Sequence, residues 1–186
     1  MRTLDGHSLV LYAGDEARLI DRVTTFLREN LALDHPVLVV ASERHRHAFS
    51  VALRAKGVDP DAKSDAGLLV FLDAVTVCDL ILVDGRIEWR RFDQIVGEAV
   101  RNLRMRGPLR VYGEVVDLLW SRGQHDIAVG LEGLWNRLRH KVDFELLCAY
   151  DIDIFDSTFR IDSADEIICA DGEVEPYGGS PGYALI

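Results

Sequence analysis

The residue best placed to do chemistry is Glu114, which follows Gly113 directly after the apolar run LRVY. A carboxylate at the end of a buried strand can act as a general base, bind a metal ion or accept a hydrogen bond from a ligand, and a glycine beside it lets another backbone approach closely. The plainer alternative is that Glu114 opens the next helix, where a negative charge favours the amide end. Both interpretations remain open at this point.

A second candidate is the loop of residues 12–17, YAGDEA, which comes directly after the first apolar run. A phosphate-binding loop at this place needs the pattern GxxxxGK[ST], because backbone amides and a lysine hold the polyphosphate. This loop has one glycine, no lysine and two carboxylates, Asp15 and Glu16. We therefore expect no nucleotide hydrolysis here, and Tyr12 and Asp15 are taken as candidate ligand contacts.

Histidine and cysteine side chains offer further chemistry. His7 precedes the first apolar run, where it can contact a ligand or donate to a carboxylate, although a capping or surface role explains it equally well. His45 and His47 are two residues apart, so a helix would turn them to different faces and they are not expected to share a metal ion. Cys148 lies inside the last apolar run; a buried thiol there acts as a small hydrophobe, whereas a sensor thiol needs exposure and a lowered pKa.

Trp120 and Trp135 are further candidates for lining a pocket, although aromatic residues at helical spacing more often belong to the core. The sequence contains no Ser/His/Asp or Cys/His set with a spacing specific to a nucleophilic enzyme, and no CxxC pair that indicates a metal site. We therefore predict a non-catalytic protein with no catalytic residue, no metal and no cofactor.

Short apolar runs rich in Val and Leu predict the strands that position these residues. Continuous apolar runs, in contrast to alternating ones, are typical of strands covered on both faces, as in a parallel sheet. The predicted strands cover residues 8–13, 36–41, 68–72, 109–112 and 144–150.

Segments with helical periodicity lie between these strands. Asp15 stands where an N-cap would accept the free first-turn amides of one helix, and Ser42 can cap a second helix that Gly57 closes. Residues 74–83 have a β-like composition but could equally form a short buried helix. The helix that Asp15 caps covers residues 15–33, and two further predicted helices cover residues 92–103 and 127–138.

Alternation of strands and helices predicts an α/β fold: three layers, with a mainly parallel central sheet flanked by helices and joined by right-handed crossovers. In an open α/β sheet, ligands bind outside the carboxyl ends of the strands. Tyr12, Asp15 and Glu114 fall at those ends, and this is why they are singled out.

The chain has 186 residues, 48% of them hydrophobic, and a formal net charge of −10. It has no apolar run approaching the roughly 18 residues that a membrane span requires, so we predict one soluble globular domain with no membrane partner. Phosphate neutralisation needs clustered Lys and Arg, so we expect no direct binding of nucleic acid. The N-terminal residues lack the long apolar segment of a secretory signal peptide, and we therefore predict a cytoplasmic location.

The negative charge is concentrated near the end of the chain. Residues 151–175 hold nine acidic residues and one basic residue, Arg160. This acidic segment is a candidate docking surface for a partner, although a solvated edge explains it equally well. The predicted domain covers residues 1–176, and residues 177–186, rich in Gly and Pro, are expected to form a frayed tail. Cys78, Cys148 and Cys169 are an odd number at wide spacing, typical of reduced thiols.

Read in order, several of these pieces form a family pattern. The pattern resembles the MEDS domain, the methanogen/methylotroph sensory domain, over about residues 7–176. The residues that carry the resemblance are His7, 11–12, 26–27, 30–31, 36–41, 67–74, 84–86, 111–116, 119–120, 131–136 and 147–150.

This resemblance implies a RecA/KaiC-like fold that has lost its ATPase loop and serves as a sensory module for small organic ligands, namely hydrocarbon derivatives. It also implies that His7 and Cys148 take part in sensing, and it favours a helix over residues 75–82. The chain departs from the family pattern at Asp171, where a histidine is expected, so no ligand role is assigned to that end.

Three hypotheses about function follow. The first is a non-catalytic domain of prokaryotic signalling that binds a small organic ligand through His7, Tyr12, Asp15, Glu114, Trp120 and Cys148, and that signals through a partner protein or a homo-oligomer. The second is a degenerate RecA-like nucleotide-binding protein in which Glu114 or Asp73 is a residual base or metal ligand. The third is a pure interaction module that captures a signalling partner through its acidic end.

Overall fold

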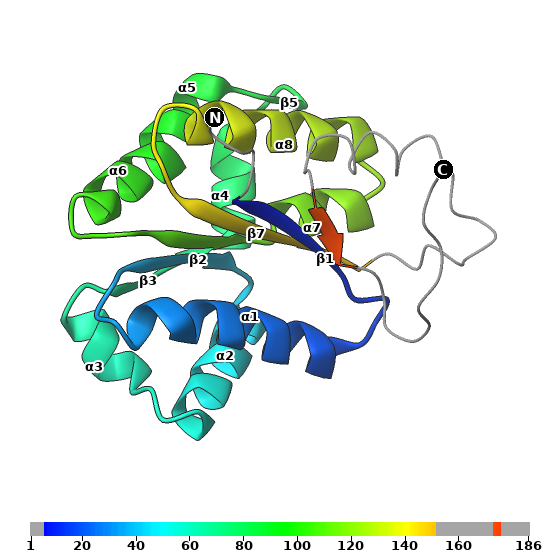
Figure 1. Ribbon diagram of the computed structural model, residues 1–186. Helices are drawn as coiled ribbons and strands as arrows, with labels where there is room; N and C mark the ends of the chain where they lie inside the picture. Colours follow the sequence, from blue (N-terminus) through cyan, green and yellow to red (C-terminus); the bar gives the residue numbers. More distant parts are fainter. Residues whose placement is uncertain (1–5, 152–172, 176–186) are drawn as a thin grey trace.

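The protein is built on one parallel sheet, seen in a computed structural model that describes residues 6–151 and 173–175 (Figure 1). The sheet has the strand order β3-β2-β6-β7-β1-β8, and every pairing in it is parallel. The strands are β1 His7–Leu11, β2 Val37–Ala41, β3 Leu69–Asp73, β6 Arg110–Gly113, β7 Glu145–Tyr150 and β8 Glu173–Glu175. Each of the five predicted strands is present, with ends that differ by one or two residues.

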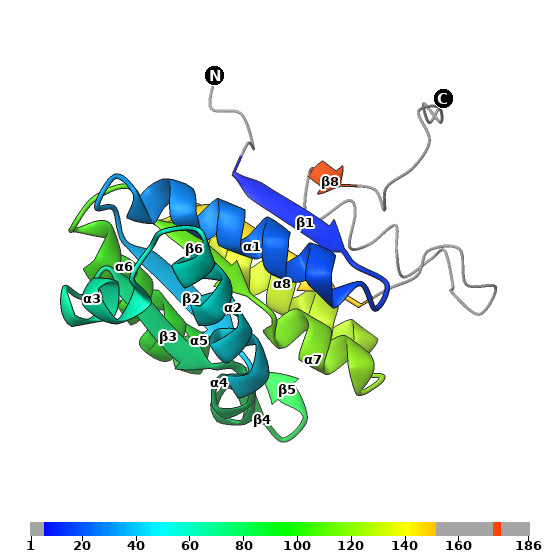
Figure 2. The same ribbon diagram turned by 90° about the horizontal axis from the view of Figure 1, so that it is seen from below.

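Helices cover both faces of this sheet, so the predicted three-layer α/β fold is confirmed. Figure 1 shows α1, α2 and α3 on one face and α4 to α8 on the other, and Figure 2 shows α1 and α2 running along the sheet. A small antiparallel pair, β4 Leu82–Val83 and β5 Arg86–Ile87, lies outside the main sheet. The helices are α1 Glu16–Leu31, α2 Glu43–Ala55, α3 Pro60–Asp65, α4 Ala74–Ile81, α5 Trp89–Phe92, α6 Glu98–Arg104, α7 Val115–Ser121 and α8 His125–Arg139.

Alternating residues of each strand pack into two separate hydrophobic cores, one on each face of the sheet. On β1, Leu9 and Leu11 pack with the helices of the α8 face, while Val10 packs with α1 and α2. On β7, Cys148 and Tyr150 take part in the first core. Because both faces of each central strand are covered, the apolar runs are continuous, as the sequence predicts.

Two predicted helix caps are confirmed. The Asp15 carboxylate accepts a hydrogen bond of 3.0 Å from the amide of Arg18, at the start of α1. The Ser42 hydroxyl accepts one of 3.3 Å from the amide of His45, at the start of α2. Gly57 follows α2 with φ +81°, the left-handed conformation that ends helices. The caps fix where each chain segment leaves the strand end, and so they orient the site described below.

One predicted helix is not continuous. The periodicity over residues 92–103 predicts a single α-helix, but the structure has α5, then a π-helical segment Asp93–Gly97, then α6. Arg101 donates to the carboxylate of Asp93 at 2.8 Å and to its backbone carbonyl at 3.0 Å. This side chain thus satisfies the carbonyl where the regular ladder is interrupted, which apolar periodicity alone does not indicate.

The ambiguous segment 74–83 is a helix for most of its length. α4 runs over Ala74–Ile81, with Asp73 accepting a hydrogen bond of 2.8 Å from the amide of Thr76 as its N-cap. The helix expected over residues 75–82 is therefore confirmed. Among residues 6–151, no helix combines the length and the apolar character that crossing a bilayer would need.

The acidic segment and the predicted tail at the end of the chain lie largely outside the described residues. Of the acidic segment, Asp151 and the backbone of Glu173–Glu175 are described, the latter as strand β8 beside β1. The predicted tail 177–186, together with Arg160, Cys169 and Asp171, lies outside the described residues.

Candidate functional site

The strand order creates a switch point between β2 and β6. β2 continues through α2 on one face of the sheet and leads outward to β3, whereas β6 continues through α7 on the opposite face and leads the other way to β7. In open α/β sheets, ligands bind beyond the carboxyl ends of the strands at such a reversal. Ser42 and Glu114 are the residues that directly follow these two strands.

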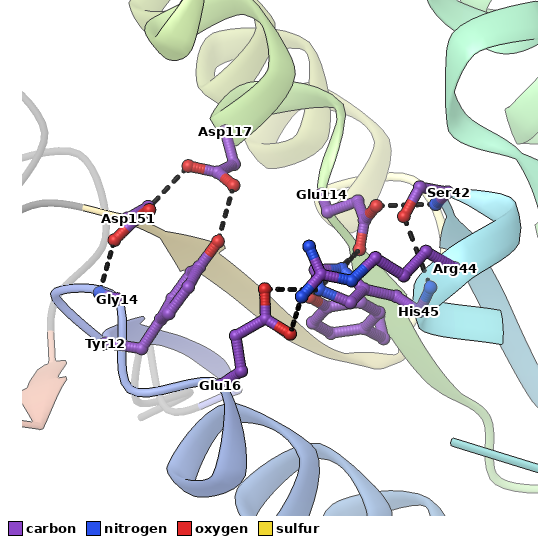
Figure 3. Close-up of polar contacts among 10 residues, drawn as sticks. Tyr12, Gly14, Glu16, Ser42, Arg44, His45, Glu114, Asp117 and Asp151 are labelled. Atoms are coloured by element: carbon purple, nitrogen blue, oxygen red, sulfur yellow. Dashed lines mark hydrogen bonds and ion pairs between the residues drawn. The ribbon is translucent and has the colours of Figure 1, made fainter. Parts of the chain in front are cut away.

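The Glu114 side chain closes this switch point. Its Oε1 accepts a hydrogen bond of 2.5 Å from the amide of Ser42, and its Oε2 lies 2.7 Å from Nδ1 of His45 (Figure 3). Glu114 also occupies the N-cap position of α7, but its side chain makes no capping hydrogen bond to that helix. Instead the carboxylate reaches across to the N-terminus of α2, so the two layers of helices are joined through one buried acid.

His45 is buried against aromatic rings and is only partly satisfied. Its ring stacks on Phe49 at 5.7 Å between centroids, and Phe49 meets Tyr112 edge-on at 5.3 Å. The hydrogen bond with Glu114 raises the pKa of His45, against burial, which lowers it. Nε2 of His45 is buried and has no hydrogen-bond partner among the described residues; the nearest carboxylate oxygen, from Glu16, is 3.9 Å away.

An exposed arginine stands beside this histidine. Arg44 pairs with Glu16, which joins the start of α2 to the start of α1. Since a buried polar atom without a partner is unfavourable, the unsatisfied Nε2 marks the point at this edge where an additional donor or acceptor would be stabilising.

A second polar group at this edge is formed by two acids, Asp117 and Asp151, and the hydroxyl of Tyr12. The Tyr12 hydroxyl donates to one Asp117 oxygen at 2.9 Å, and the amide of Asp151 donates to the other at 2.7 Å. Burial raises the pKa of Asp117 to about 6, and the negative charges of Glu114 and Asp151 act in the same direction. Burial also raises the pKa of Tyr12, and the Asp117 charge adds to it.

The loop 12–17 holds a carboxylate of the protein itself. Its Gly14 amide donates to an Asp151 oxygen at 2.5 Å, and both Ala13 and Gly14 have positive φ, at +45° and +74°. In a phosphate-binding loop, such an amide faces the anion of the nucleotide. Here the Asp151 carboxylate takes the place of such an anion. This agrees with the absence of the GxxxxGK[ST] pattern from the sequence.

A separate polar cluster lies in the interior between the sheet and α8. Nε2 of His7 is 3.4 Å from Sγ of Cys148 and 3.5 Å from Oε2 of Glu132. Sγ of Cys148 is 3.7 Å from the same Glu132 oxygen. All three residues are buried, with exposed fractions of 3% for His7 and 0% for the other two. We call these three residues the buried triad.

The family model for MEDS, the MEthanogen/methylotroph, DcmR Sensory domain, matches residues 6–165 of this chain. The chain belongs to the MEDS family. Comparison with curated proteins finds no match. MEDS is a sensory domain family, so this chain has a sensory role in signalling, and the matched range includes both the switch point and the buried triad.

In this MEDS domain the six candidate residues do not form one site. Tyr12 and Glu114 lie at the strand ends, whereas His7 and Cys148 meet in the interior. The Asp15 side chain caps α1. Trp120 is half-buried, stacks on His125 at 4.1 Å and meets Tyr150 edge-on at 5.7 Å. Tyr150 connects the two regions, because its hydroxyl donates to Glu132 while its backbone carbonyl accepts from the Tyr12 amide.

Three residues of the two regions have no candidate role in the sequence-based prediction. His45 was considered only for a metal site shared with His47, and its partner Glu114 is 69 residues away. Asp117 lies one helical turn after Glu114, so a search of the first turn after each strand would include it. Glu132 lies on the buried stripe of α8 with Ala128, Leu131 and Trp135; a charged residue on an apolar stripe is the signal that points to a buried partner.

The alternative roles of two other residues are resolved by contacts. Trp135 is 1% exposed and packs edge-on against Phe92 at 5.0 Å, as a core residue. Asp73, a residual base in the nucleotide-binding hypothesis, is the N-cap of α4 and also pairs with Arg46 at 2.9 Å. The Thr76 amide lowers the pKa of Asp73, which suits a cap better than a base.

Proposed function

We propose that this MEDS domain is a non-catalytic sensor that binds a small organic ligand at the switch point between β2 and β6. The observation that carries the proposal is the buried Nε2 of His45, which has no hydrogen-bond partner among the described residues. A hydroxyl, carbonyl or other small polar group placed there would satisfy this atom, and the adjacent rings of Phe49 and Tyr112 offer an apolar environment.

Binding is favoured over catalysis by the way the acids at this edge are used. Glu114 accepts from Ser42 and contacts His45, and Asp117 accepts from Tyr12 and Asp151. A general base must reach a proton of the substrate, whereas these carboxylates hold protein groups in place. We therefore assign Tyr12 and Glu114 to positioning the ligand site, with Asp15 and Trp120 at its borders.

The charge of the edge favours a ligand without phosphate groups. Glu16, Glu114, Asp117 and Asp151 come together there, and the Gly14 amide already donates to a carboxylate. A polyphosphate would meet these negative charges without a lysine to offset them. This supports a hydrocarbon derivative, the ligand class that the MEDS resemblance implies, and it argues against the degenerate nucleotide-binding alternative within a RecA/KaiC-like fold.

The contacts of Glu114 also suggest how ligand binding could be transmitted to a signalling partner. Because it links the N-terminus of α2 to the strand-end of β6, a ligand that competes for His45 changes a contact between the two helix layers. His7 and Cys148 then respond through Tyr150, which contacts both regions. We place the output on a partner protein or a second copy of the chain, in the regulation of transcription, and the action in the cytoplasm, where thiols such as Cys78 and Cys148 stay reduced.

Thermal unfolding with a panel of small alcohols, ketones, carboxylic acids and chlorinated methanes at millimolar concentration tests the proposal. We expect at least one class to raise the Tm in a concentration-dependent manner, because a ligand that binds only the folded state stabilises it. Native mass spectrometry of gently purified protein would then show a small molecule of the same class.

Two variants localise the binding. His45→Asn keeps a nitrogen near the position of Nδ1, which can donate to Glu114, but removes Nε2; it is expected to abolish the shift in Tm. His47→Asn, at an exposed position of the same helix, should leave the shift unchanged. The proposal is wrong if no member of the panel acts, or if His45→Asn responds like the parent. Stabilisation by ATP and magnesium instead would favour the nucleotide-binding alternative.

A further inference from the structure

We propose that the buried triad binds a divalent transition metal ion, with Zn²⁺ as the best match. His7 on β1, Glu132 on α8 and Cys148 on β7 offer one nitrogen, one oxygen and one sulfur donor. The three potential ligand atoms lie within 4.8 Å of one another, and all three residues are buried. This proposal does not depend on the ligand site at the strand ends.

The separations between the donor atoms fit one face of a tetrahedron. Zinc binds histidine nitrogen and carboxylate oxygen at about 2.0–2.2 Å and thiolate sulfur at about 2.3 Å, so neighbouring donors in a tetrahedral site are about 3.4–3.6 Å apart. The observed separations are 3.4 Å between His7 Nε2 and Cys148 Sγ, 3.5 Å between His7 Nε2 and Glu132 Oε2, and 3.7 Å between the sulfur and the same oxygen. An ion would therefore need only small movements of the side chains.

Partners around the triad orient its donors as they do in metal sites. Nδ1 of His7 lies 3.2 Å from the side-chain oxygen Oδ1 of Asn136, so the tautomer with hydrogen on Nδ1 fits and Nε2 presents its lone pair to the other two donors. The hydroxyl of Tyr150 donates to Oε1 of Glu132 at 2.8 Å, which leaves Oε2 toward the triad. Metal-binding histidines and carboxylates regularly have such outer partners.

Charge balance gives an independent argument. Glu132 is 0% exposed and lies in the apolar core of the α8 face, where an ionised carboxylate is unfavourable unless it is paired. A divalent cation with one thiolate, one carboxylate and one neutral imidazole sums to zero charge. The ion would thus offset the negative charges of the carboxylate and the thiolate, and it would bind Cys148 in its thiolate form.

The donor set also selects the class of metal. Magnesium and calcium prefer oxygen ligands throughout, whereas a mixed set of nitrogen, sulfur and oxygen suits zinc and other transition metals. Three protein donors leave one tetrahedral position for a small exogenous donor, of which water is the simplest. Since β1, β7 and α8 each supply one ligand, the ion would hold the sheet and its covering helix together.

Cobalt provides the test, because Co²⁺ reports thiolate ligation and tetrahedral geometry by its absorption. The full chain is treated with chelator under reducing conditions and titrated with Co²⁺ and then with Zn²⁺. We expect one ion per chain, a thiolate-to-cobalt charge-transfer band, strong d–d bands of a tetrahedral site, and loss of all bands when Zn²⁺ displaces Co²⁺. Zinc is also expected to raise the Tm of the metal-free protein.

Variants separate this site from other thiols. The double variant Cys78→Ala/Cys169→Ala retains Cys148 alone and should keep the charge-transfer band; adding Cys148→Ser should remove it. Asn136→Ala, which removes the partner of His7 but no donor, should weaken the affinity for the ion by about 10–100-fold. Circular dichroism confirms that each variant is folded, and Glu132→Gln offers a second test of the donor set with little change in volume.

The proposal is overturned if Co²⁺ gives no charge-transfer band in the parent, if the band survives Cys148→Ser, or if binding is weak and exceeds one ion per chain. Those results would leave the triad as a network of hydrogen bonds. They would not bear on the strand-end ligand, whose test uses the organic panel and His45→Asn.

Discussion

Asp117 makes the stability of this domain depend on pH in an unusual direction. Burial raises its pKa from 3.8 to about 6 in the folded protein, whereas an unfolded chain has an ordinary aspartate pKa of about 3.9. The folded state therefore binds the proton more tightly than the unfolded state does. The stabilisation from protonated Asp117 is complete below about pH 4 and is lost as the pH rises through about 6.

The size of this effect follows from the difference in pKa. A rise from 3.8 to about 6 corresponds to about 3 kcal/mol, at 1.36 kcal/mol for each pH unit. Many other carboxylates titrate in the same range, so the effect is isolated by comparing the parent with Asp117→Asn. Asparagine keeps an oxygen that can accept from Asp151 or Tyr12 but has no proton to lose.

The assay is urea unfolding at several pH values from 4 to 7.5, for the parent and for Asp117→Asn. We expect the free energy of unfolding of the parent to fall relative to that of the variant by about 2–3 kcal/mol across this range, because pH 4 already lies near the pKa of the unfolded aspartate. Asp126→Asn, at an exposed position of α8, controls for the loss of one negative charge. Parallel curves for the parent and Asp117→Asn would refute the reasoning, because they would mean that Asp117 has the same pKa in both states.

Three further predictions use the same unfolding assay. Gly113→Ala should lose about 1–3 kcal/mol, because a Cβ there would lie 3.2 Å from Cζ2 of Trp135 in a filled core; an unchanged midpoint would show that the ring can move. Gly130→Ala, inside α8 with nothing within 4 Å of the added carbon, should gain about 0.5–1 kcal/mol through helix propensity alone, and a loss would contradict the open space there. Glu114→Gln should lose about 3–5 kcal/mol, because it removes one member of a buried charged contact with His45; a loss below about 1 kcal/mol would place that contact among exposed, weak pairs.

Local sequence patterns predicted most strands and helix starts. The features that they did not predict depend mostly on contacts between residues far apart in the sequence. The continuous apolar runs predicted β1, β2, β3, β6 and β7 because these strands pack against helices on both faces of the sheet. Asp15 and Ser42 marked helix starts because capping is a local interaction. The π-helical segment was not predicted, since Arg101 reaches a carbonyl eight residues earlier.

The contacts at the strand ends could be predicted only in part from the sequence. Glu114 and Tyr12 could be placed at the strand ends because each directly follows a strand. His45 was not identified as a site residue, because its importance depends on a carboxylate 69 positions away, and His7 meets Cys148 across 141 positions. Glu132 was visible in the sequence as an acid on an apolar stripe, but its partners lie on two other elements. Contacts between residues so far apart in the sequence can be identified only once the strand order is known.

The most direct test of the sensory proposal observes His45 itself. Long-range ¹H–¹⁵N spectra of the histidine side chains, recorded while a stabilising compound from the organic panel is added, report the state of each ring nitrogen. The account predicts that the Nε2 signal of His45 moves with ligand concentration while those of the exposed His47 and His140 stay fixed. A compound that stabilises the protein while the His45 signals remain unchanged would contradict a ligand site at the β2–β6 switch point.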